Sequence, residues 1–325
     1  MGIQEIGGYI EFEHYSGTIL HEKAISLNCG RNCFSYLIKA KNIKKIAIPF
    51  LNCDCIEDIC KKNNLIYRFY HINKFFQPVE ELEIEENEWL YLVNYYGQLS
   101  TDTLDKYILK SEKRVICDNA HAYFEMPYKG IDTIYTCRKY FGVADGAFLY
   151  TDTRDTSIDT SIHQDVSYGR MLFLMGRFEN SASKFYEMYI KNNEFFLNQP
   201  IKKMSKLTEN ILRSLNYEDI EDRRRENFSY LHECFKNINM LTHIVIPKGP
   251  FMYPLYVHNG ENIRKELVKE KIYIPILWPN ISDNCQKNDL EYDMTKNVLP
   301  LPVDQRYKKE DLKRVVNIIL NHFAE

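Results

Sequence analysis

Hydrophobic residues in the first half of the chain gather in short runs that are separated by longer amphipathic segments. Six of these runs have the length of a strand and are rich in β-branched and aromatic residues, which favours β-structure. They span residues 44–50, 64–72, 88–96, 113–121, 132–139 and 145–152. The segments 55–63 and 100–113 between them show helical spacing. Strands that alternate with helices predict an α/β fold with a mostly parallel sheet covered on both faces.

The pattern changes after about Ser167, where long segments have apolar residues at spacings of three and four. The predicted helices there span residues 170–196, 206–215 and 221–238. Farther on, strand-like runs alternate again with helical ones, and residues 299–307 are interpreted as the lead-in to the last helix. The strand-like runs span residues 243–248, 251–258 and 272–278, and the helical ones 262–271 and 308–323.

This second alternating region predicts a smaller α/β lobe. A length of 325 residues agrees with two lobes, because single cores seldom grow much beyond about 250 to 300 residues. We expect residues 1–215 to form a large domain with an N-terminal arm. Residues 216–325 are expected to form the small domain.

Charge and composition exclude several classes of partner. The formal net charge is −3 and no basic stretch is sustained, so we expect no binding to nucleic acid or to an anionic membrane. The N-terminal sequence MGIQEIGGYIEFEHYSG lacks the cationic and apolar parts of a signal peptide, and no apolar run approaches 18 residues. These features predict a cytoplasmic protein.

The nine cysteines are odd in number and scattered, which indicates reduced thiols. Cys53, Cys55 and Cys60 form the one local cluster in the sequence. Because the chain has no CxxC pair and no histidine at zinc-finger spacing, we predict no metal site.

Candidate chemistry lies where predicted strands end, since ligands of open α/β sheets bind beyond the carboxyl ends of the strands. Asp118 ends the run RVICD, and His121 follows three residues later. Asp118 has two interpretations. It caps the following turn, which is common for aspartate, or it is a buried carboxylate that needs a cationic partner.

Lys139 comes directly after Arg138 at the end of another predicted strand. A lysine reacts with aldehydes when burial or a neighbouring cation lowers its pKa, and Arg138 supplies such a cation. A solvated Arg-Lys pair is the alternative interpretation of the same residues. Upstream, Gly30 and Arg31 lie in a turn before a helical run, and a helix N-terminus is a seat for phosphate.

A phosphate seat, a strand-end aspartate and a lysine about twenty residues later are together the parts that pyridoxal phosphate (PLP) requires. The sequence also resembles the DegT/DnrJ/EryC1/StrS family of sugar aminotransferases. CDNAHA at 117–122 is similar to the family's E-D-A-A-[HQ]-A, and NYYGQ at 94–98 is similar to its H-L-Y-G-Q. The interval from Lys139 to Gly146 matches that between the family's Schiff-base lysine and its glycine pair, and RRRENFSYL resembles the helix before its small domain.

The resemblance implies a type I PLP-transferase fold, with a mostly parallel seven-stranded sheet in the large domain and a smaller C-terminal α/β domain. It implies that Lys139 forms the Schiff base and later moves the substrate proton. Asp118 would pair with the pyridinium nitrogen, and His121 would lie near the ring. The remaining cofactor-binding residues that it suggests are Gly30, Arg31, Asn32, Thr136 and Arg138.

Several positions depart from the family pattern. Ile134 stands where the family usually has a serine, and Asn94 replaces the histidine of H-L-Y-G-Q. The family's segment with the ring-stacking aromatic residue corresponds here to IPFLNCDC. Trp89 and Trp278 lie in apolar runs and are interpreted as core residues.

The resemblance implies a homodimeric aminotransferase that moves an amino group from glutamate to a nucleotide-linked keto-sugar, as in polysaccharide biosynthesis. Two alternatives stay open. One is a non-catalytic or repurposed protein on the same fold with an altered substrate site. The other is an unrelated enzyme in which Asp118 and His121 act as an acid and base pair.

Overall fold

The computed structural model describes residues 6–323 of the chain. Seven strands form one sheet in the order β1-β7-β6-β5-β4-β2-β3. The strands are β1 (Ile25–Leu27), β2 (Lys45–Pro49), β3 (Ile66–Tyr70), β4 (Trp89–Val93), β5 (Val115–Asp118), β6 (Asp132–Thr136) and β7 (Ala147–Tyr150). The strands from β3 to β6 run parallel, whereas β7 is antiparallel to both β6 and β1. The predicted mostly parallel, seven-stranded sheet is confirmed.

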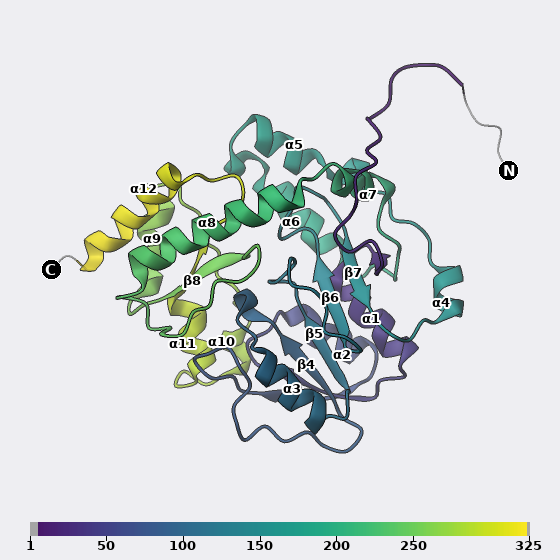
Figure 1. The fold of residues 1–325 in the computed structure, drawn as a ribbon, viewed down its shortest axis with the longest axis horizontal. Coiled ribbons are helices and arrows are strands. Elements are labelled where there is room, and N and C mark those ends of the chain that lie inside the picture. Colours follow the sequence, from purple (N-terminus) through teal and green to yellow (C-terminus); the bar gives the residue numbers. More distant parts are fainter. Residues whose placement is uncertain (1–5, 324–325) are drawn as a thin grey trace.

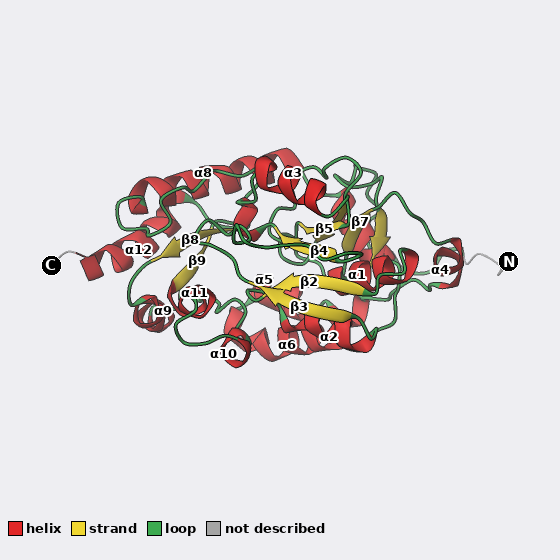
Figure 2. Ribbon diagram, turned by 90° about the horizontal axis from the view of Figure 1, so that it is seen from below, coloured by secondary structure: helices red, strands yellow, loops and turns green. Residues whose placement is uncertain are grey.

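Helices lie on both sides of this sheet; Figure 2 shows α3 on one side of the strands and α2 on the other. Figure 1 shows the N-terminal segment extending away from the body of the protein and α12 at the opposite end. The helices are α1 (Gly30–Ala40), α2 (Asp54–Lys62), α3 (Thr101–Lys110), α4 (Thr156–Ser161), α5 (Leu172–Glu179), α6 (Tyr186–Phe195), α7 (Lys206–Arg213), α8 (Tyr217–Phe235), α9 (Gly260–Lys269), α10 (Ile281–Asn284), α11 (Leu290–Asn297) and α12 (Lys309–Leu320). None of the helices within residues 6–323 is long and apolar enough to cross a membrane.

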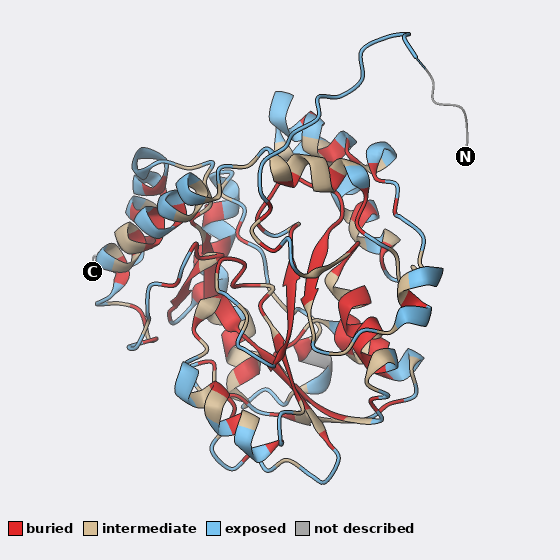
Figure 3. Ribbon diagram, turned by 45° about the vertical axis from the view of Figure 1, so that its right-hand side comes forward, coloured by how far each residue is buried: buried red, intermediate tan, exposed pale blue. Residues whose placement is uncertain are grey.

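The largest core lies where the central strands pack against their covering helices. Ile46 of β2, Leu90 of β4 and Ile116 of β5 are fully buried there, together with Leu37 of α1. Figure 3 shows buried strands surrounded by helices whose outer faces are exposed. Apolar residues at consecutive positions of a strand suit this arrangement, because parallel strands are covered on both faces.

A second core is built by the C-terminal part of the chain. It contains Phe228 and Leu231 of α8, Leu255 of β8 (Met252–Tyr256) and Val315 of α12. β8 pairs in antiparallel fashion with β9 (Val298–Pro302) in a two-stranded sheet. The helices α8, α9 and α12 and one side of the β8–β9 sheet therefore share an apolar core, whereas Ile281 of α10 and Met294 of α11 pack into the core of the large sheet.

Three details of the C-terminal prediction were wrong. Residues 243–248 and 272–278 form no strand, and residues 298–302, whose greater part was interpreted as a helix lead-in, form β9. Pro254 of β8 stands opposite Pro300 of β9. Alternate residue pairs of an antiparallel ladder exchange no hydrogen bonds, so two prolines without N–H groups are tolerated at such a pair.

The connection between β6 and β7 is fixed by Asp145, which is fully buried. Its carboxylate accepts hydrogen bonds from the N–H and the hydroxyl of Ser205, both at 2.7 Å, at the start of α7. The next residue, Gly146, has φ +111°, and a Cβ there would lie 3.2 Å from the sulfur of Cys137. The segment that carries Lys139 is thus anchored at its far end.

Candidate active site

The carboxylate of Asp118 lies at the carboxyl end of β5, in the middle of the sheet. Its Oδ2 accepts a hydrogen bond from the hydroxyl of Tyr91 at 2.9 Å, and its Oδ1 accepts one from the N–H of Ala120 at 2.8 Å. Burial raises the pKa of Asp118, and the charge of Lys139 and the two hydrogen bonds oppose that rise. Asp118 therefore caps the turn that follows it, and the charge of Lys139 acts on its carboxylate, although no ion pair joins the two within residues 6–323.

The side chain of Lys139 is open to solvent, whereas Cys137 and Tyr140 nearby are buried. Its Nζ lies 5.5 Å from the centroid of the Phe251 ring. Although water reaches the side chain, the surrounding protein desolvates the amine and thereby lowers the pKa of Lys139, and the charge of Asp118 opposes this. The amine is thus unprotonated more often at neutral pH than that of an ordinary lysine, which favours reaction with a carbonyl carbon.

His121 is buried in a stack of aromatic rings. The centroid of its ring lies 4.4 Å from that of Phe251, 5.6 Å from that of Trp278 and 5.4 Å from that of Tyr96. Burial, helped by the charge of Lys139, lowers the pKa of His121 well below its ordinary value, so the ring is neutral at neutral pH. Its Nδ1 is buried without a hydrogen-bond partner among the described residues. Because such an unpaired nitrogen costs free energy, a ligand that pairs with it gains affinity.

The N-terminus of α1 brings Gly30, Arg31 and Asn32 together. No side chain caps this helix start, so the first-turn N–H groups and the helix dipole favour an anion. The amide nitrogen of Asn32 donates to Oδ1 of Asn28 at 2.7 Å and to the backbone oxygen of Pro200 at 2.8 Å. The side chain of Asn32 is therefore used in contacts within the protein, while Gly30 and Arg31 remain the candidates for binding an anion.

Arg31 and Arg138 converge on Asn193 near the C-terminal end of α6. Nη1 of Arg31 donates to the backbone oxygen of Asn193 at 3.3 Å, and Nη1 of Arg138 donates to its Oδ1 at 2.6 Å. The guanidinium of Arg138 lies 4.5 Å from the centroid of the Phe196 ring, and its Nε is buried without a partner in the described part of the chain. Burial lowers the pKa of Arg138, but a guanidinium stays charged in proteins. Two cations beside one helix N-terminus attract anions.

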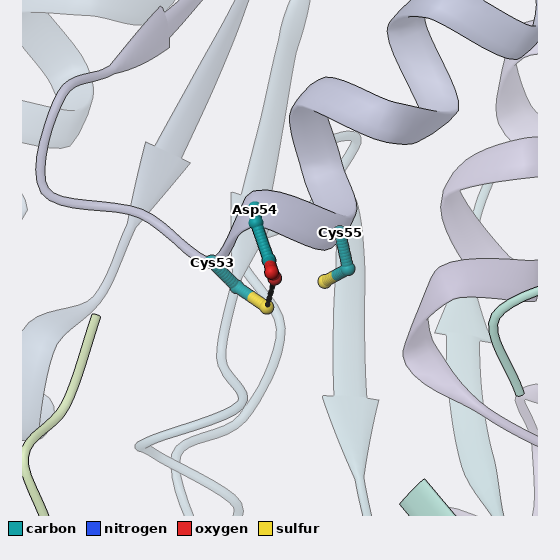
Figure 4. A group of neighbouring side chains, drawn as sticks. All are labelled: Cys53, Asp54 and Cys55. Atoms are coloured by element: carbon teal, nitrogen blue, oxygen red, sulfur yellow. Dashed lines mark hydrogen bonds between the residues drawn. The ribbon is translucent and has the colours of Figure 1, made fainter. Parts of the chain in front are cut away.

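Cys53, Asp54 and Cys55 lie at the start of α2 (Figure 4). One donor atom from each lies within 4.8 Å of the others, and the thiol of Cys53 donates to Oδ1 of Asp54 at 3.2 Å. Figure 4 shows the two sulfur atoms on the same side of the first turn of α2. The predicted absence of a metal site is not tested by this arrangement, and we assign no metal because the cation of Arg31 lies beside Cys55.

The predicted site residues form two groups in space. The sheet-end group consists of Asp118, His121 and Lys139, and the charge of Lys139 influences the pKa of both other members. The α1-end group consists of Gly30, Arg31 and Arg138, and the two arginines are close enough to influence each other's charge. Thr136 is buried at the end of β6, two residues before Arg138 in the sequence. Since Arg138 and Lys139 are consecutive, the two groups adjoin.

Sequence reasoning missed several neighbours of these groups. Tyr91 holds Asp118, Phe251 packs against His121, and Asn193 holds both arginines. Trp278 was interpreted as a core residue; it is half-buried and also packs against His121. Only Tyr91 had a signal, because it lies on the neighbouring strand β4, two residues before Val93, which pairs with Asp118.

Comparison with known proteins assigns the fold. No protein-family model matches the sequence, and no curated protein sequence matches it. Solved structures of sugar aminotransferases match the fold across nearly the whole chain. CalS13 of Micromonospora echinospora is 15% identical, with a TM-score of 0.63 over 93% of this chain and 88% of the other.

Two further matches extend this likeness. A DegT DnrJ EryC1 StrS aminotransferase from Brucella abortus is 10% identical, with a TM-score of 0.63 over 93% of this chain and 86% of the other. The PMP form of Spr1654, a sugar aminotransferase from Streptococcus pneumoniae, is 13% identical, with a TM-score of 0.65 over 92% and 88%. The structural neighbours are thus DegT/DnrJ/EryC1/StrS sugar aminotransferases, and the chain has the type I fold of PLP-dependent aminotransferases.

Proposed function

We propose that the protein is a PLP-dependent aminotransferase that moves an amino group, taken from glutamate, to a nucleotide-linked keto-sugar. The observation that carries this proposal is the placement of Asp118 at the end of β5 and of Lys139 just beyond the end of the adjacent β6, where desolvation by the surrounding protein lowers the pKa of the lysine and the charge of Asp118 opposes this. The likeness of the fold to sugar aminotransferases supports the same reaction class.

The residues present fit PLP. The cofactor needs an amine for its aldehyde, a carboxylate for its ring nitrogen and donors for its phosphate. Lys139 and Asp118 supply the first two. The uncapped start of α1, with Arg31 and the unpaired Nε of Arg138, supplies phosphate donors. One structural neighbour was solved in a PLP form and a PMP form, which supports this choice of cofactor.

When bound, PLP supplies an aldehyde and an electron-withdrawing ring. The protein's own groups handle the charges and protons. Asp118 would hold the ring nitrogen through its negative charge, and Tyr91 keeps that carboxylate in place. Lys139 would hold the aldehyde through its unprotonated amine and, when free, would move the proton at the substrate carbon. Its lowered pKa suits both tasks.

The other residues bind, orient and exclude water. Arg31, Arg138 and the start of α1 hold the phosphate. The neutral ring of His121, packed between Phe251 and Trp278, covers one side of the site and offers its unpaired Nδ1 to a polar atom. Thr136, at the end of β6 and two residues before Arg138, would be a further phosphate ligand.

The proposal includes a homodimer, with residues 1–215 as the cofactor-binding domain and residues 216–325 as the small domain. Large apolar side chains of α5 and α6 are exposed in the single chain, and an exposed apolar surface of this kind suits an interface. They are Leu172, Met175, Phe178, Tyr186, Met188 and Tyr189. A second copy would bury them, and sedimentation of the purified protein measures whether it dimerises.

Addition of glutamate to the PLP-loaded protein tests the proposal. We expect the yellow colour of the bound aldehyde to disappear while 2-oxoglutarate forms in equal amount. Lys139→Ala should do neither, although it folds. Lys202→Ala removes another lysine of the large domain and is the matched control. Unchanged colour with glutamate, in protein that has bound PLP, would overturn the aminotransferase proposal.

A second candidate is a non-catalytic protein on the same fold. Arg31, Arg138 and the amide of Asn32 all donate to oxygen atoms of the protein itself, which favours a phosphate seat closed by the chain. This candidate predicts a folded protein that takes up no PLP at any concentration. Titration of the purified protein with PLP therefore distinguishes the two candidates.

A further inference from the structure

We propose that Cys53 and Cys55 form a reversible disulfide when the protein meets a hydroperoxide, and that this modification controls Arg31. The disulfide does not depend on the proposed function, because it involves the chain alone. The control of phosphate binding by Arg31 rests on the proposed function.

The geometry brings the two sulfur atoms together. The donor atoms of Cys53 and Cys55 lie within 4.8 Å of each other, on the same side of the first turn of α2 (Figure 4). Cys53 is the N-cap residue with extended backbone, at φ −67° and ψ 134°, and Cys55 lies inside the helix. Rotation of the two side chains therefore suffices to approach bonding distance.

The charges favour a thiolate at Cys55. Its pKa is lowered to about 7, first because the thiol of Cys53 shares a hydrogen bond with it and then because Arg31 lies beside it, while burial opposes the shift. The same contact and burial raise the pKa of Cys53. The pair thus loses one proton near neutral pH, and its thiolate is the nucleophile that peroxides oxidise.

A cavity gives small molecules access to this thiolate. Cys55, Arg31, Ser35, Lys62 and Phe196 are among the residues that line a cavity of about 320 Å³ between α1, α2 and the segment after α6. A hydroperoxide is small enough to enter it. Arg31, which lines the cavity, favours the anionic form of the sulfur, while the charge of Asp54 opposes it.

One hydrogen peroxide oxidises the two thiols in two steps. The thiolate of Cys55 attacks one oxygen of hydrogen peroxide, the O–O bond breaks, and hydroxide leaves as the sulfur becomes a sulfenic acid; the hydroxide takes up the proton that Cys55 had released and becomes the first water. The sulfur of Cys53 then attacks Cys55, the S–O bond breaks, and the hydroxyl leaves as a second water with the proton of Cys53. Two thiols are oxidised and one peroxide is reduced to two waters.

The disulfide changes the surroundings of Arg31. In the reduced protein the thiolate of Cys55 partly neutralises that guanidinium, and oxidation removes the negative charge. Arg31 then has more positive potential to offer an anion such as phosphate. Oxidation should therefore tighten the binding of PLP by about threefold or more, through Arg31.

Peptide mass measurement tests the disulfide. Cys60→Ser protein is used, so that the tryptic peptide from Ile46 to Lys61 contains two cysteines, Cys53 and Cys55. After brief treatment with hydrogen peroxide and alkylation in denaturant, this peptide should be unalkylated and lighter by two hydrogens than its reduced form. Dithiothreitol should restore alkylation. Cys234, which is also partly exposed, is the internal control and should remain a thiol.

Variants separate the steps. In Cys53→Ser, oxidation should stop at a sulfenic acid on Cys55, which dimedone traps. In Cys55→Ser, the remaining thiol of Cys53 should react with peroxide no faster than the thiol of Cys234. The disulfide is overturned if Cys53 and Cys55 are both alkylated as fully after treatment as before, or if either pairs with another cysteine instead.

The control of Arg31 has its own test. PLP is titrated into oxidised and reduced Cys60→Ser protein, and equal affinities would overturn this part. If the disulfide forms but neither form binds PLP, the proposed cofactor is wrong while the disulfide stands. If PLP binds but no disulfide forms, the inference fails and the proposed function survives.

Discussion

The sheet-end group and the α1-end group are held in different ways. Asp118 is held by Tyr91 on the neighbouring strand and by Ala120, two residues farther along the chain. Arg31 and Arg138, in contrast, are held by Asn193, which lies 162 residues after Arg31. The carboxylate of Asp118 is therefore held within the sheet, whereas the groups that would bind an anion depend on a distant segment.

Because the two groups are held differently, the reactivity of the site and its affinity for an anion depend on different parts of the chain. Asp118 is fixed by its hydrogen bonds before any ligand arrives, as preorganised catalysis requires, whereas Lys139 lies in the turn after β6 with its side chain open to solvent. At the α1-end group, the C-terminal end of α6 occupies donors that a phosphate would use, so ligand binding is coupled to the position of α6. Substitutions in the sheet-end group should alter the rate of amino transfer, and substitutions at the contact with α6 should alter the affinity for PLP.

The largest effect is expected from Asp118→Asn. The amide keeps the size of the side chain but lacks the negative charge opposite the ring nitrogen, so amino transfer from glutamate should slow by about a thousandfold. PLP affinity should change far less. Stopped-flow measurement of the reaction with glutamate gives the rate. Asp102→Asn, at an exposed position of α3, is the control, and a rate within threefold of the parent would break the distinction between the two groups.

The next largest effect is expected from His21, which is buried among aromatic rings beside β6. His21 stacks on Tyr135 of β6 at 4.1 Å, and its Nε2 lies 2.8 Å from the backbone oxygen of Tyr123. Burial is the main reason that the pKa of His21 falls to about 4, from an ordinary 6.5. Because this pKa is lower in the folded chain, the unfolded chain binds the proton more readily. The stabilising contribution is present above pH 6.5 and is lost as the pH falls to 4.

This linkage should amount to about 3 kcal/mol of the pH dependence of unfolding. His21→Asn should have a lower free energy of unfolding than the parent at pH 7. Between pH 7 and pH 4 its free energy of unfolding should fall less than that of the parent, by about the linkage energy. Urea unfolding at several pH values measures it, with the exposed His163→Asn as the control. A pH dependence equal to that of the parent would show that His21 is not a buried neutral support of the sheet end.

The smallest effect is expected from Asn193→Ala. Removal of the side-chain oxygen frees Nη1 of Arg138, so PLP should bind about threefold more tightly, equivalent to about 0.6 kcal/mol. The rate with saturating glutamate should not change. Fluorescence titration with PLP measures the affinity, and Asn180→Ala at an exposed position provides the control. Weaker binding would mean that Asn193 positions the arginine for the ligand instead of competing with it.

The same contrast explains what the sequence predicted. Asp118 and Lys139 could be placed because each follows an apolar run by one to three residues, and parallel strands bring their carboxyl ends to one edge. Six of the seven strands followed from the same runs, whereas β1 (Ile25–Leu27) was not predicted from them. Local pattern thus sufficed for the sheet end.

The rest depended on contacts between distant residues. Nothing near Asn193 or Phe251 in the sequence indicates that they reach Arg138 and His121. β9 was missed because its prolines indicate a turn; Pro300 is acceptable because both strands of the two-stranded sheet are edge strands, which tolerate a residue without an N–H group. The engagement of Asn32 by Pro200 likewise depends on a segment whose position no local pattern encodes.

The central claim is that the aldehyde of PLP bonds to Lys139. The most direct measurement is borohydride reduction of the PLP-treated protein followed by peptide mass analysis. We predict one pyridoxyl group on the peptide that begins at Lys139 and ends at Arg154, and none in Lys139→Ala. A pyridoxyl group on another lysine, or none on folded protein at saturating PLP, would contradict the account.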